Sequence, residues 1–320
     1  MEVIQLRPAF KDYLWGGRRL VDEYDKKADC DPVAESWELS AHKDGSSTIV
    51  GGAYDGMLFK DYIDQHAKDL WGTKAAKDAT FPILIKFIDA KQPLSIQVHP
   101  DDTYAWEHEH EPGKNEFWYV MEADPDSFLY YGVKEPMTKE EYRAHIQDDT
   151  ICDYLNKVHV KKGDCFFIQA GTIHAIGAGL MIAEIQQSSN STYRVYDFGR
   201  VGKDGKPRQL HIDKAVDVSN LTPSGKNGEA EGPLIQKNGY TEQVLTKNNY
   251  FTCTKYHVDT TYTETVTKMS FQGLTILDGQ GALSYDDQVL PLRKGDSVFI
   301  PAQDGKYEMS GNLTWIQTVL

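Results

Sequence analysis

The sequence has no long hydrophobic run and nothing that looks like a secretion signal. No apolar stretch in its 320 residues approaches the roughly 20 residues that a membrane-spanning helix needs. The start of the chain, MEVIQLRPAF, lacks the charged and apolar regions of a signal peptide. We therefore expect a soluble cytoplasmic protein with no membrane partner.

Positive charge and cysteine are also scarce. The chain has 34 Lys and Arg against 48 Asp and Glu, a net charge of -14, which argues against a nucleic-acid partner because phosphate backbones need a basic surface. Its four cysteines are scattered and include no CxxC pair, as is typical of a protein from a reducing compartment without a zinc finger. A small anionic substrate, held by a few local Arg or Lys side chains, remains compatible with this composition.

Several motifs of common enzyme classes are missing. Neither GxGxxG nor GxxxxGK[ST] occurs, so no glycine-rich phosphate loop is expected. The sequence also lacks the GxSxG turn of hydrolases and the HExxH zinc motif. The chemistry must therefore be sought in residues brought together by the fold.

Most of the chain consists of short β-branched or aromatic runs between Gly, Pro, Asp and Asn, a pattern that predicts a mainly β fold. Residues 57–70 and 138–156 have helical spacing, and the second segment opens with a capping box of Thr138 and Glu141. The polar stretch 222–232 is the predicted linker.

An internal repeat crosses this linker. VKKGDCFFIQAGTIHAI at 160–176 aligns with LRKGDSVFIPAQDGKYEM at 292–309, and each copy is a tight Gly-Asp turn that leads into a strand. We therefore predict two jelly-roll barrels with a small helical insertion. Residues 1–234 form the predicted catalytic, metal-binding barrel, and 235–320 a degenerate barrel without a metal site. His174 stands eleven residues after the glycine of the first copy, where the second copy has Lys306.

The stretch PLSIQVHPDD at 93–102 places two ligand-type side chains on one face of a short strand. Gln97 and His99 share a face because side chains two residues apart on a strand point the same way. Leu94, Ile96 and Val98 then form the packed face, and Pro100 ends the strand.

Two further ligand-type residues lie at expected strand ends. Glu116 begins the apolar strand that continues to Val120, and His174 ends a predicted strand from Cys165. Two imidazoles, a carboxylate and an amide oxygen suit a divalent ion such as zinc, and nitrogen and oxygen ligands of this kind are typical of a catalytic site. We therefore predict that Gln97, His99, Glu116 and His174 bind one Zn²⁺.

Three charged residues are candidates for the same site. Lys86 lies in the apolar strand FPILIKFIDA, where its amine either reaches the surface at a strand edge or serves as an active-site cation. Glu184 and Arg194 lie in EIQQSSNSTYRVYDFGR, and the fixed planar donors of arginine suit an anionic sugar group.

Taken together and in this order, these motifs resemble those of class I mannose-6-phosphate isomerases of the short bacterial form. The resemblance rests on QPLSIQVHPDD, GKNEFWYV, AGTIHAIG and EIQQSSNSTYRVYDFGR, with WGGRRL and AESWELSAH upstream, and covers most of residues 7–211. It departs at Gln169, where cupins usually have proline.

The resemblance implies a zinc-dependent cupin that interconverts mannose 6-phosphate and fructose 6-phosphate by proton transfer through an enediolate. It also implies the four zinc ligands named above and active-site roles for Lys86, Glu184 and Arg194. Arg200 and Lys114 are the expected phosphate contacts, the general base is not assigned, and either a monomer or a homodimer is compatible.

Two other functions are compatible with the same residues. One is an iron-dependent cupin oxygenase, although such sites use two His and one carboxylate and leave Gln97 without a purpose. The other is a non-catalytic cupin that binds sugar phosphates.

Overall fold

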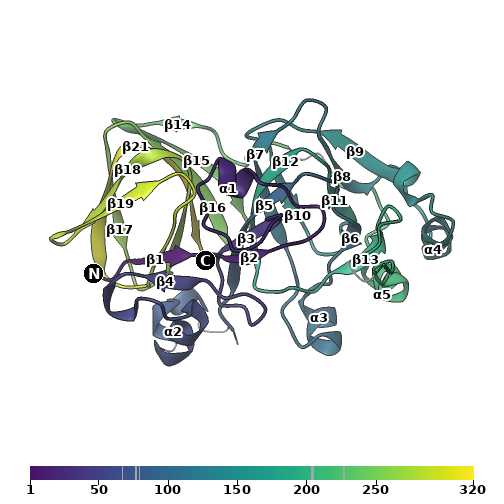
Figure 1. Cartoon of the computed structure of the whole chain (residues 1–320), viewed down its shortest axis with the longest axis horizontal. Helices are drawn as coiled ribbons and strands as arrows, with labels where there is room; N and C mark the ends of the chain where they lie inside the picture. The colour runs from purple at the N-terminus through teal and green to yellow at the C-terminus, as the bar shows by residue number, and fades with distance from the viewer. Residues whose placement is uncertain (67, 76–77, 79, 203–204, 226–227) are drawn as a thin grey trace.

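The structure is a computed structural model, which describes residues 1–66, 68–75, 78, 80–202, 205–225 and 228–320. Two β units lie side by side, with helices α2 to α5 at the periphery (Figure 1). The predicted mainly β, cupin-type fold is confirmed. We call the unit that contains the six- and five-stranded sheets the first barrel, and the unit built on the ten-stranded sheet the second barrel.

Two antiparallel sheets pack against each other in the first barrel, in the orders β10-β7-β12-β5-β3-β2 and β13-β6-β11-β8-β9. Trp118 and Ile182 of one sheet share a buried cluster with Leu129 and Ile176 of the other, as expected for two sheets that bury their apolar faces together. The strands are β2 (Ala9–Lys11), β3 (Glu35–Leu39), β5 (Ile83–Ala90), β6 (Ile96–Val98), β7 (Glu116–Ala123), β8 (Phe128–Val133), β9 (Leu155–His159), β10 (Cys165–Ile168), β11 (His174–Ile176), β12 (Leu180–Gln187) and β13 (Tyr193–Tyr196).

The second barrel is one antiparallel sheet built around two long strands, β18 and β21. Its apolar side chains, Tyr307 and Trp315 among them, form a separate buried cluster. Its strands are β1 (Ile4–Arg7), β4 (Thr48–Val50), β14 (Ile235–Gln236), β15 (Tyr240–Lys247), β16 (Thr252–Val258), β17 (Thr261–Val266), β18 (Gln272–Tyr285), β19 (Gln288–Arg293), β20 (Ser297–Ile300) and β21 (Gly305–Val319).

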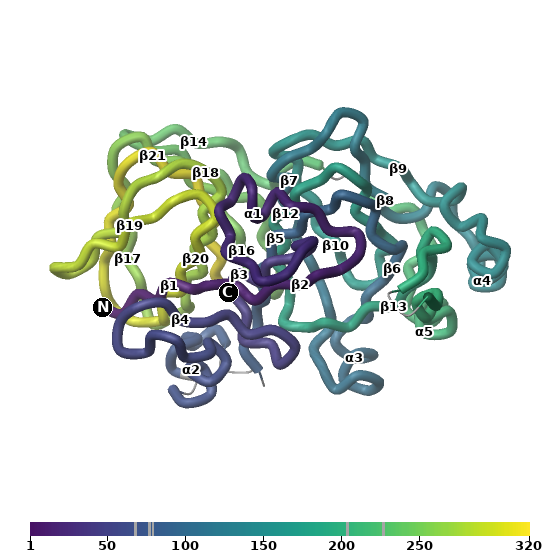
Figure 2. Tube along the Cα trace, viewed as in Figure 1, coloured from purple at the N-terminus to yellow at the C-terminus, as the bar shows by residue number. Residues whose placement is uncertain are grey.

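The start of the chain joins the two barrels. Strand β1 pairs with β20 on one side and β4 on the other, so two N-terminal strands belong to the sheet of the second barrel (Figure 2). Phe299 of β20 packs against Phe59 and Phe81, at ring-centroid distances of 4.9 and 5.9 Å. The barrels therefore share buried apolar surface, and the domain division at residue 234 stays a prediction.

The two predicted helical segments each contain a short α-helix. In 57–70 the helix is α2 (Phe59–His66), residue 67 lies outside the described residues, and a 3-10 turn follows at Lys68–Leu70. In 138–156 the helix is α4 (Lys139–Gln147), and its N-terminus has the predicted capping box of Thr138 and Glu141. The remaining helices are α1 (Arg19–Asp22), α3 (Asp102–His108) and α5 (Ile212–Val218), with 3-10 turns at Gly52–Tyr54, Thr73–Ala75 and Ile151–Tyr154.

None of the helices in the described part of the chain has the length and apolar character needed to cross a membrane. The predicted linker at 222–232 contains no helix or strand in its described residues apart from an isolated bridge between Gly228 and Cys165; residues 226 and 227 lie outside the description.

The predicted single strand from Cys165 to His174 is wrong. Strand β10 ends at Ile168, and His174 begins β11 in the other sheet. Between them Thr172 N–H donates to Gln169 C=O, and Gly171 has a φ of 88°, a conformation that glycine adopts without strain. The turn carries the chain from one sheet to the other, so His174 starts a strand instead of ending one.

Candidate metal centre and active site

Three strands of the first barrel bring the predicted ligands together. Strand β6 ends before Pro100 and carries Gln97, β7 begins with Glu116, and β11 begins with His174. His174 is paired directly with Gln97 across β11 and β6. The chain leaves β6 at His99, whose side chain is 1% exposed. The predicted ligands therefore lie within or next to the ends of these strands, where a short backbone segment fixes each side chain.

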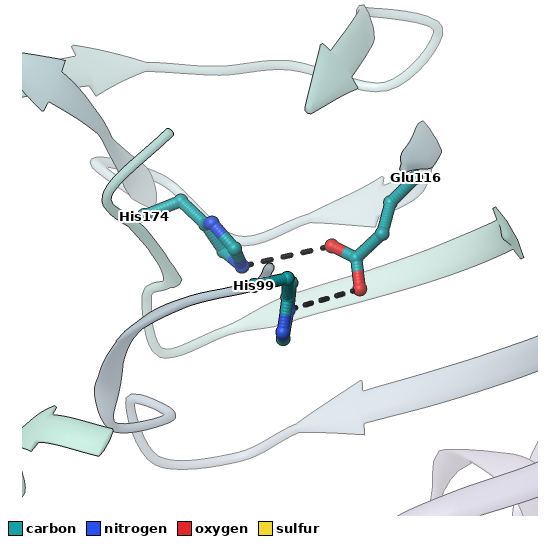
Figure 3. A group of neighbouring side chains, drawn as sticks. All are labelled: His99, Glu116 and His174. Atoms are coloured by element: carbon teal, nitrogen blue, oxygen red, sulfur yellow. Dashed lines mark ion pairs between the residues drawn. The ribbon is translucent and has the colours of Figure 1, made fainter. Parts of the chain in front are cut away.

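The side chains of His99, Glu116 and His174 converge on a common point (Figure 3). Their candidate ligand atoms all lie within 4.8 Å of one another. His99 Nε2 is 3.2 Å from Glu116 Oε1, and His174 Nε2 is 3.6 Å from Glu116 Oε2. The amide nitrogen of Gln97 is 3.4 Å from His174 Nε2, so all four predicted ligands are neighbours. This group of three is the only His, Cys, Asp and Glu cluster of metal-binding geometry in the described ranges.

Hydrogen bonds fix both imidazole rings with Nε2 towards this point. His99 Nδ1 is 2.8 Å from the carbonyl oxygen of Ser191, and His174 Nδ1 is 2.8 Å from that of Thr172. Because a carbonyl oxygen only accepts, each Nδ1 carries the proton and each Nε2 presents a lone pair that can bind a cation. This orientation by a backbone carbonyl is a recurrent property of metal-binding histidines.

The protonation states of the cluster also suit a cation. Burial, assisted by the charge of Lys114, lowers the pKa of His99 to about 4, and burial lowers the pKa of His174. Burial alone would raise the pKa of Glu116, but the charge of Lys114, together with the interaction with His99, outweighs it and holds this pKa well below its usual range. At neutral pH the cluster therefore has two neutral imidazoles and one carboxylate.

Glu116 has no complete set of protein partners. Its side chain is fully buried, and neither carboxylate oxygen accepts a hydrogen bond of normal geometry from the described residues. Buried charged oxygens are costly unless they are paired or bind a metal. The nearest cation is Lys114, which forms an ion pair with Glu116 and lies 3.2 Å from His99 Nε2. The donor set thus already attracts a positive charge, and it fits a divalent ion.

A cavity of about 280 Å³ adjoins the cluster, reaching it through Gln97 and Lys114. It is lined by six charged side chains together with apolar and neutral polar ones. The charged ones are Glu35, Lys86, Lys114, Glu184, Arg194 and Arg208.

Lys86 and Glu184 face each other across β5 and β12, where they are directly paired. Lys86 Nζ is 3.1 Å from Glu184 Oε1, and Glu184 Oε2 accepts a hydrogen bond of 2.8 Å from Trp118. Burial lowers the pKa of Lys86, but Glu184 and the more distant Glu35 and Glu116 outweigh it and raise this pKa above its usual value. Lys86 is therefore a buried, charged wall residue of the cavity and does not reach the surface at a strand edge.

Arg194 lies beside Gln97 in the pairing of β13 with β6, and it lines the cavity. One guanidinium nitrogen donates to the carbonyl oxygen of Gln209 at 2.8 Å, while Nε is buried and has no hydrogen-bond partner among the described residues. Arg200 is not among the residues that line this cavity, and its guanidinium bonds Asp197 and the carbonyl oxygen of Pro93. The structure therefore brings Arg194 to the site, whereas the role predicted for Arg200 receives no support from the geometry.

Sequence reasoning missed several residues of the cavity wall, among them Tyr13, Glu35, Asn190 and Arg208. Glu35 lies in AESWELSAH and Asn190 in EIQQSSNSTYRVYDFGR, so both were inside motifs that carried the resemblance. Arg208 lies in an irregular segment without a motif. Its position is set by tertiary contacts that no local pattern reveals.

Comparison with known proteins agrees with this geometry. The family described as "Phosphomannose isomerase type I, catalytic domain" matches residues 3–128, and "Mannose-6-phosphate isomerase, cupin domain" matches residues 241–320. A mannose-6-phosphate isomerase of Streptococcus mutans is 37% identical over 98% of this chain and 96% of its own length. The chain belongs to the mannose-6-phosphate isomerase family. The resemblance expected from the sequence motifs, and with it membership of an isomerase family, is confirmed.

Other members of the mannose-6-phosphate isomerase family extend the comparison. The ManA mannose-6-phosphate isomerase of Bacillus subtilis is 33% identical over 97% of this chain and 96% of its own length. A crystal structure of the mannose 6-phosphate isomerase from Bacillus subtilis superposes with a TM-score of 0.92, at 32% identity and 99% coverage of both chains. A putative mannosephosphate isomerase from Archaeoglobus fulgidus, at 22% identity and a TM-score of 0.75, shares the fold.

Proposed function

We propose that this protein is a zinc-dependent aldose–ketose isomerase that interconverts mannose 6-phosphate and fructose 6-phosphate. The observation that carries the proposal is the buried group of His99, Glu116 and His174 beside a cavity lined by Lys86, Glu184 and Arg194. The relatives named as mannose-6-phosphate isomerases support the choice of substrate.

His99, Glu116 and His174 would hold the zinc ion, and Gln97 would add an amide oxygen after a half-turn of its side-chain amide. Two nitrogen ligands, one carboxylate and one amide suit zinc and leave room for substrate. When bound, the ion supplies a Lewis acid that stabilises negative charge on the sugar oxygens. Because Lys114 lies among the ligand atoms and also lines the cavity, its ammonium group can turn towards the sugar oxygens when the ion binds.

The reaction moves a carbonyl group between C1 and C2 of the sugar. A proton leaves one carbon and returns to the other through an enediolate, which requires donors for the oxygens and a group that carries the proton. We assign Arg194 to the developing oxyanion because its buried Nε has no hydrogen-bond partner in the described part of the chain. Lys86 and Glu184, held together by their ion pair, would position the sugar hydroxyls.

The test is a coupled assay of mannose 6-phosphate conversion, run in H₂O and in D₂O. We expect fructose 6-phosphate as the product and, in D₂O, deuterium from the solvent on the carbon next to the carbonyl group. Absence of conversion by the metal-loaded protein would refute the function. Complete conversion without any deuterium in the product would show that the transferred proton does not exchange with solvent. The proton would then be shielded from water during transfer, or the hydrogen would move by another route.

A further inference from the structure

An irregular segment, residues 188–192, joins β12 to β13 and contacts the candidate metal centre. The carbonyl oxygen of its Ser191 accepts the hydrogen bond of 2.8 Å from His99 Nδ1. A hydrogen bond of this kind fixes the imidazole ring and makes the opposite nitrogen a better ligand. The segment has no helix or strand of its own, so the position of this carbonyl depends on the side chains that hold the segment.

The carboxylate of Glu111 accepts hydrogen bonds from three donors of this segment. Its Oε2 accepts from the backbone N–H of Asn190 at 3.2 Å, and from the hydroxyls of Ser189 and Ser191 at 3.5 and 3.4 Å. The backbone N–H of Ser191 donates to the Ser189 hydroxyl at 3.2 Å. Both donors of Ser191 therefore lead to Glu111, one directly and one through Ser189. Hydrogen bonds that end on a charged acceptor are stronger than those between neutral groups.

The other carboxylate oxygen of Glu111 faces the loop that follows β3. Oε1 is 2.8 Å from Lys43 Nζ, and Asn190 of the segment donates to Asp44 in the same loop at 2.9 Å. Burial alone would raise the pKa of Glu111, but the hydrogen bonds from Lys43 and Asn190 outweigh it and lower this pKa below its usual value. The side chain of Glu111 is 14% exposed. Glu111 is therefore a largely buried, ionised group that ties the segment to a neighbouring loop.

The start of the segment is also held from β12. The carbonyl oxygen of Ser189 accepts a hydrogen bond of 2.7 Å from the side chain of Gln186, a residue of this strand. This bond does not involve Glu111 and would keep the start of the segment in place without it. Loss of the carboxylate should therefore displace Ser191, at the far end, and leave the sheet intact.

We propose that Glu111 is a positioning residue of the metal centre, which holds the Ser191 carbonyl against His99 and so orients the imidazole that would bind zinc. The inference rests on the proposed function and deepens it, because it names a carboxylate that acts through another residue. Glu111 is outside the group that could hold the ion. It lies five residues before Glu116, in the loop that leads into β7, so one loop supplies a ligand and orients a second.

The binding test compares Glu111→Gln with wild type. We expect the zinc dissociation constant, measured by competition with a chelator, to rise about tenfold, at the low end of the effect of losing a partner of a metal-binding histidine. At saturating zinc, turnover should return to within about threefold of wild type. Glu111→Asp keeps the charge and should show a smaller rise. The matched control is Glu107→Gln, which removes an exposed carboxylate of α3 and should leave zinc affinity unchanged.

Proton NMR of the zinc-loaded protein with isotope-labelled histidine reads the His99 contact directly. The Nδ1 proton of His99, identified by its absence in His99→Gln, should exchange with solvent about tenfold faster in Glu111→Gln. A merely structural role of Glu111 would lower the melting temperature and leave this exchange unchanged.

These readouts separate the inference from the proposed reaction. Weaker zinc binding and faster exchange in Glu111→Gln, in a protein whose wild type converts no sugar, would refute the reaction and leave the positioning role standing. Wild-type zinc affinity and exchange in Glu111→Gln, or the same changes in Glu107→Gln, would overturn the inference. If Glu111→Gln does not fold, the comparison of Glu111→Asp with wild type decides.

Discussion

The turns that precede β10 in the first barrel and β20 in the second have the same backbone geometry. Gly163 and Gly295 have φ values of 93° and 92°. In each turn the side chain of the aspartate after this glycine accepts a hydrogen bond of 2.9 Å from the backbone N–H three residues earlier. Lys161 donates to Asp164, and Arg293 donates to Asp296. The repeat seen in the sequence is therefore a repeat in the structure.

The residues beyond these turns have diverged. Ile168 of β10 and Ile300 of β20 occupy equivalent places after the two turns. Ile168 is paired with Glu116, whereas Ile300 is paired with Gln272. Gln272 is buried like Glu116, but it accepts hydrogen bonds from Tyr307 at 2.9 Å and from Gln317 at 3.1 Å. The same strand position thus carries a carboxylate without complete partners in one barrel and, in the other, a neutral amide whose oxygen accepts two hydrogen bonds. The turn and strand thus provide a location, and the side chains at that location decide whether a cation can be bound.

Replacement of Glu116 by Gln should make the first barrel resemble the second at this position. We expect isomerase turnover to fall about a thousandfold or more and bound metal to fall well below one ion per chain, because the only carboxylate ligand is lost and the metal supplies several kcal/mol of transition-state stabilisation. Metal analysis and the coupled assay measure both effects.

The control for this variant lies in the second barrel. Lys306 is exposed and stands where the first copy of the repeat has His174, so Lys306→Ala should keep turnover and metal content. Full turnover and full metal content in Glu116→Gln would contradict the ligand assignment.

The shared core of the two barrels predicts the next largest effect. Phe299 is fully buried and contacts the rings of Phe59, Phe81 and Phe271. Phe299→Ala should lower the free energy of unfolding by about 3–5 kcal/mol, and hydrogen exchange should accelerate in strands of both barrels. The exposed Val289→Ala should change stability by less than about 0.5 kcal/mol. Faster exchange confined to the second barrel would show that the barrels unfold independently.

The two interiors should also differ in their response to pH. His99 in the metal-free protein has a pKa of about 4 because it is buried, against about 6.5 in an unfolded chain. Between these values the unfolded chain binds a proton that the folded chain does not, so stability falls as pH falls. From pH 6.5 to pH 5 the free energy of unfolding should fall by about 2 kcal/mol through this group. Burial raises the pKa of Tyr307 in the second barrel well above its usual value. Its hydroxyl, which donates to Gln272, therefore does not titrate in this pH range.

Urea denaturation of chelated protein at these two pH values measures the difference. His99→Gln should make the free energy of unfolding less dependent on pH, whereas substitution of the exposed His159 by Gln should not. An equal pH dependence in wild type and His99→Gln would show that His99 is not held neutral by burial.

The smallest expected effect concerns a chain of hydrogen bonds that leads from the second barrel to the start of β7, which carries Glu116. The side chains of Tyr250 and Gln187 both donate to Asp102. Gln187 also accepts a hydrogen bond from Asn115, the residue before Glu116. Tyr250→Phe removes one hydrogen bond of about 1 kcal/mol and should raise the metal dissociation constant by about two- to tenfold. Tyr285→Phe, whose hydroxyl contacts Gln288 in a distant hairpin, is the control. Equal metal affinity in both variants would limit the second barrel to a structural role.

The candidate metal cluster could be predicted from sequence because its residues lie in short motifs that report local strand geometry. Alternation along 93–99 placed Gln97 and His99 on one face, and the apolar run after Glu116 marked a strand start. The crossing of β1 and β4 into the second barrel could not be predicted, since strand pairing between distant segments leaves no local pattern. The same holds for Arg208, whose place depends on Asp197 and on the path of an irregular segment.

If His99, Glu116 and His174 bind the ion on which isomerisation depends, turnover must follow zinc occupancy. The decisive measurement is a titration of the chelated protein with zinc, with bound zinc and turnover recorded in parallel. We expect no turnover without metal, and turnover that rises with bound zinc and saturates at about one ion per chain. Full turnover by the chelated protein would show that these residues do not act through a bound ion.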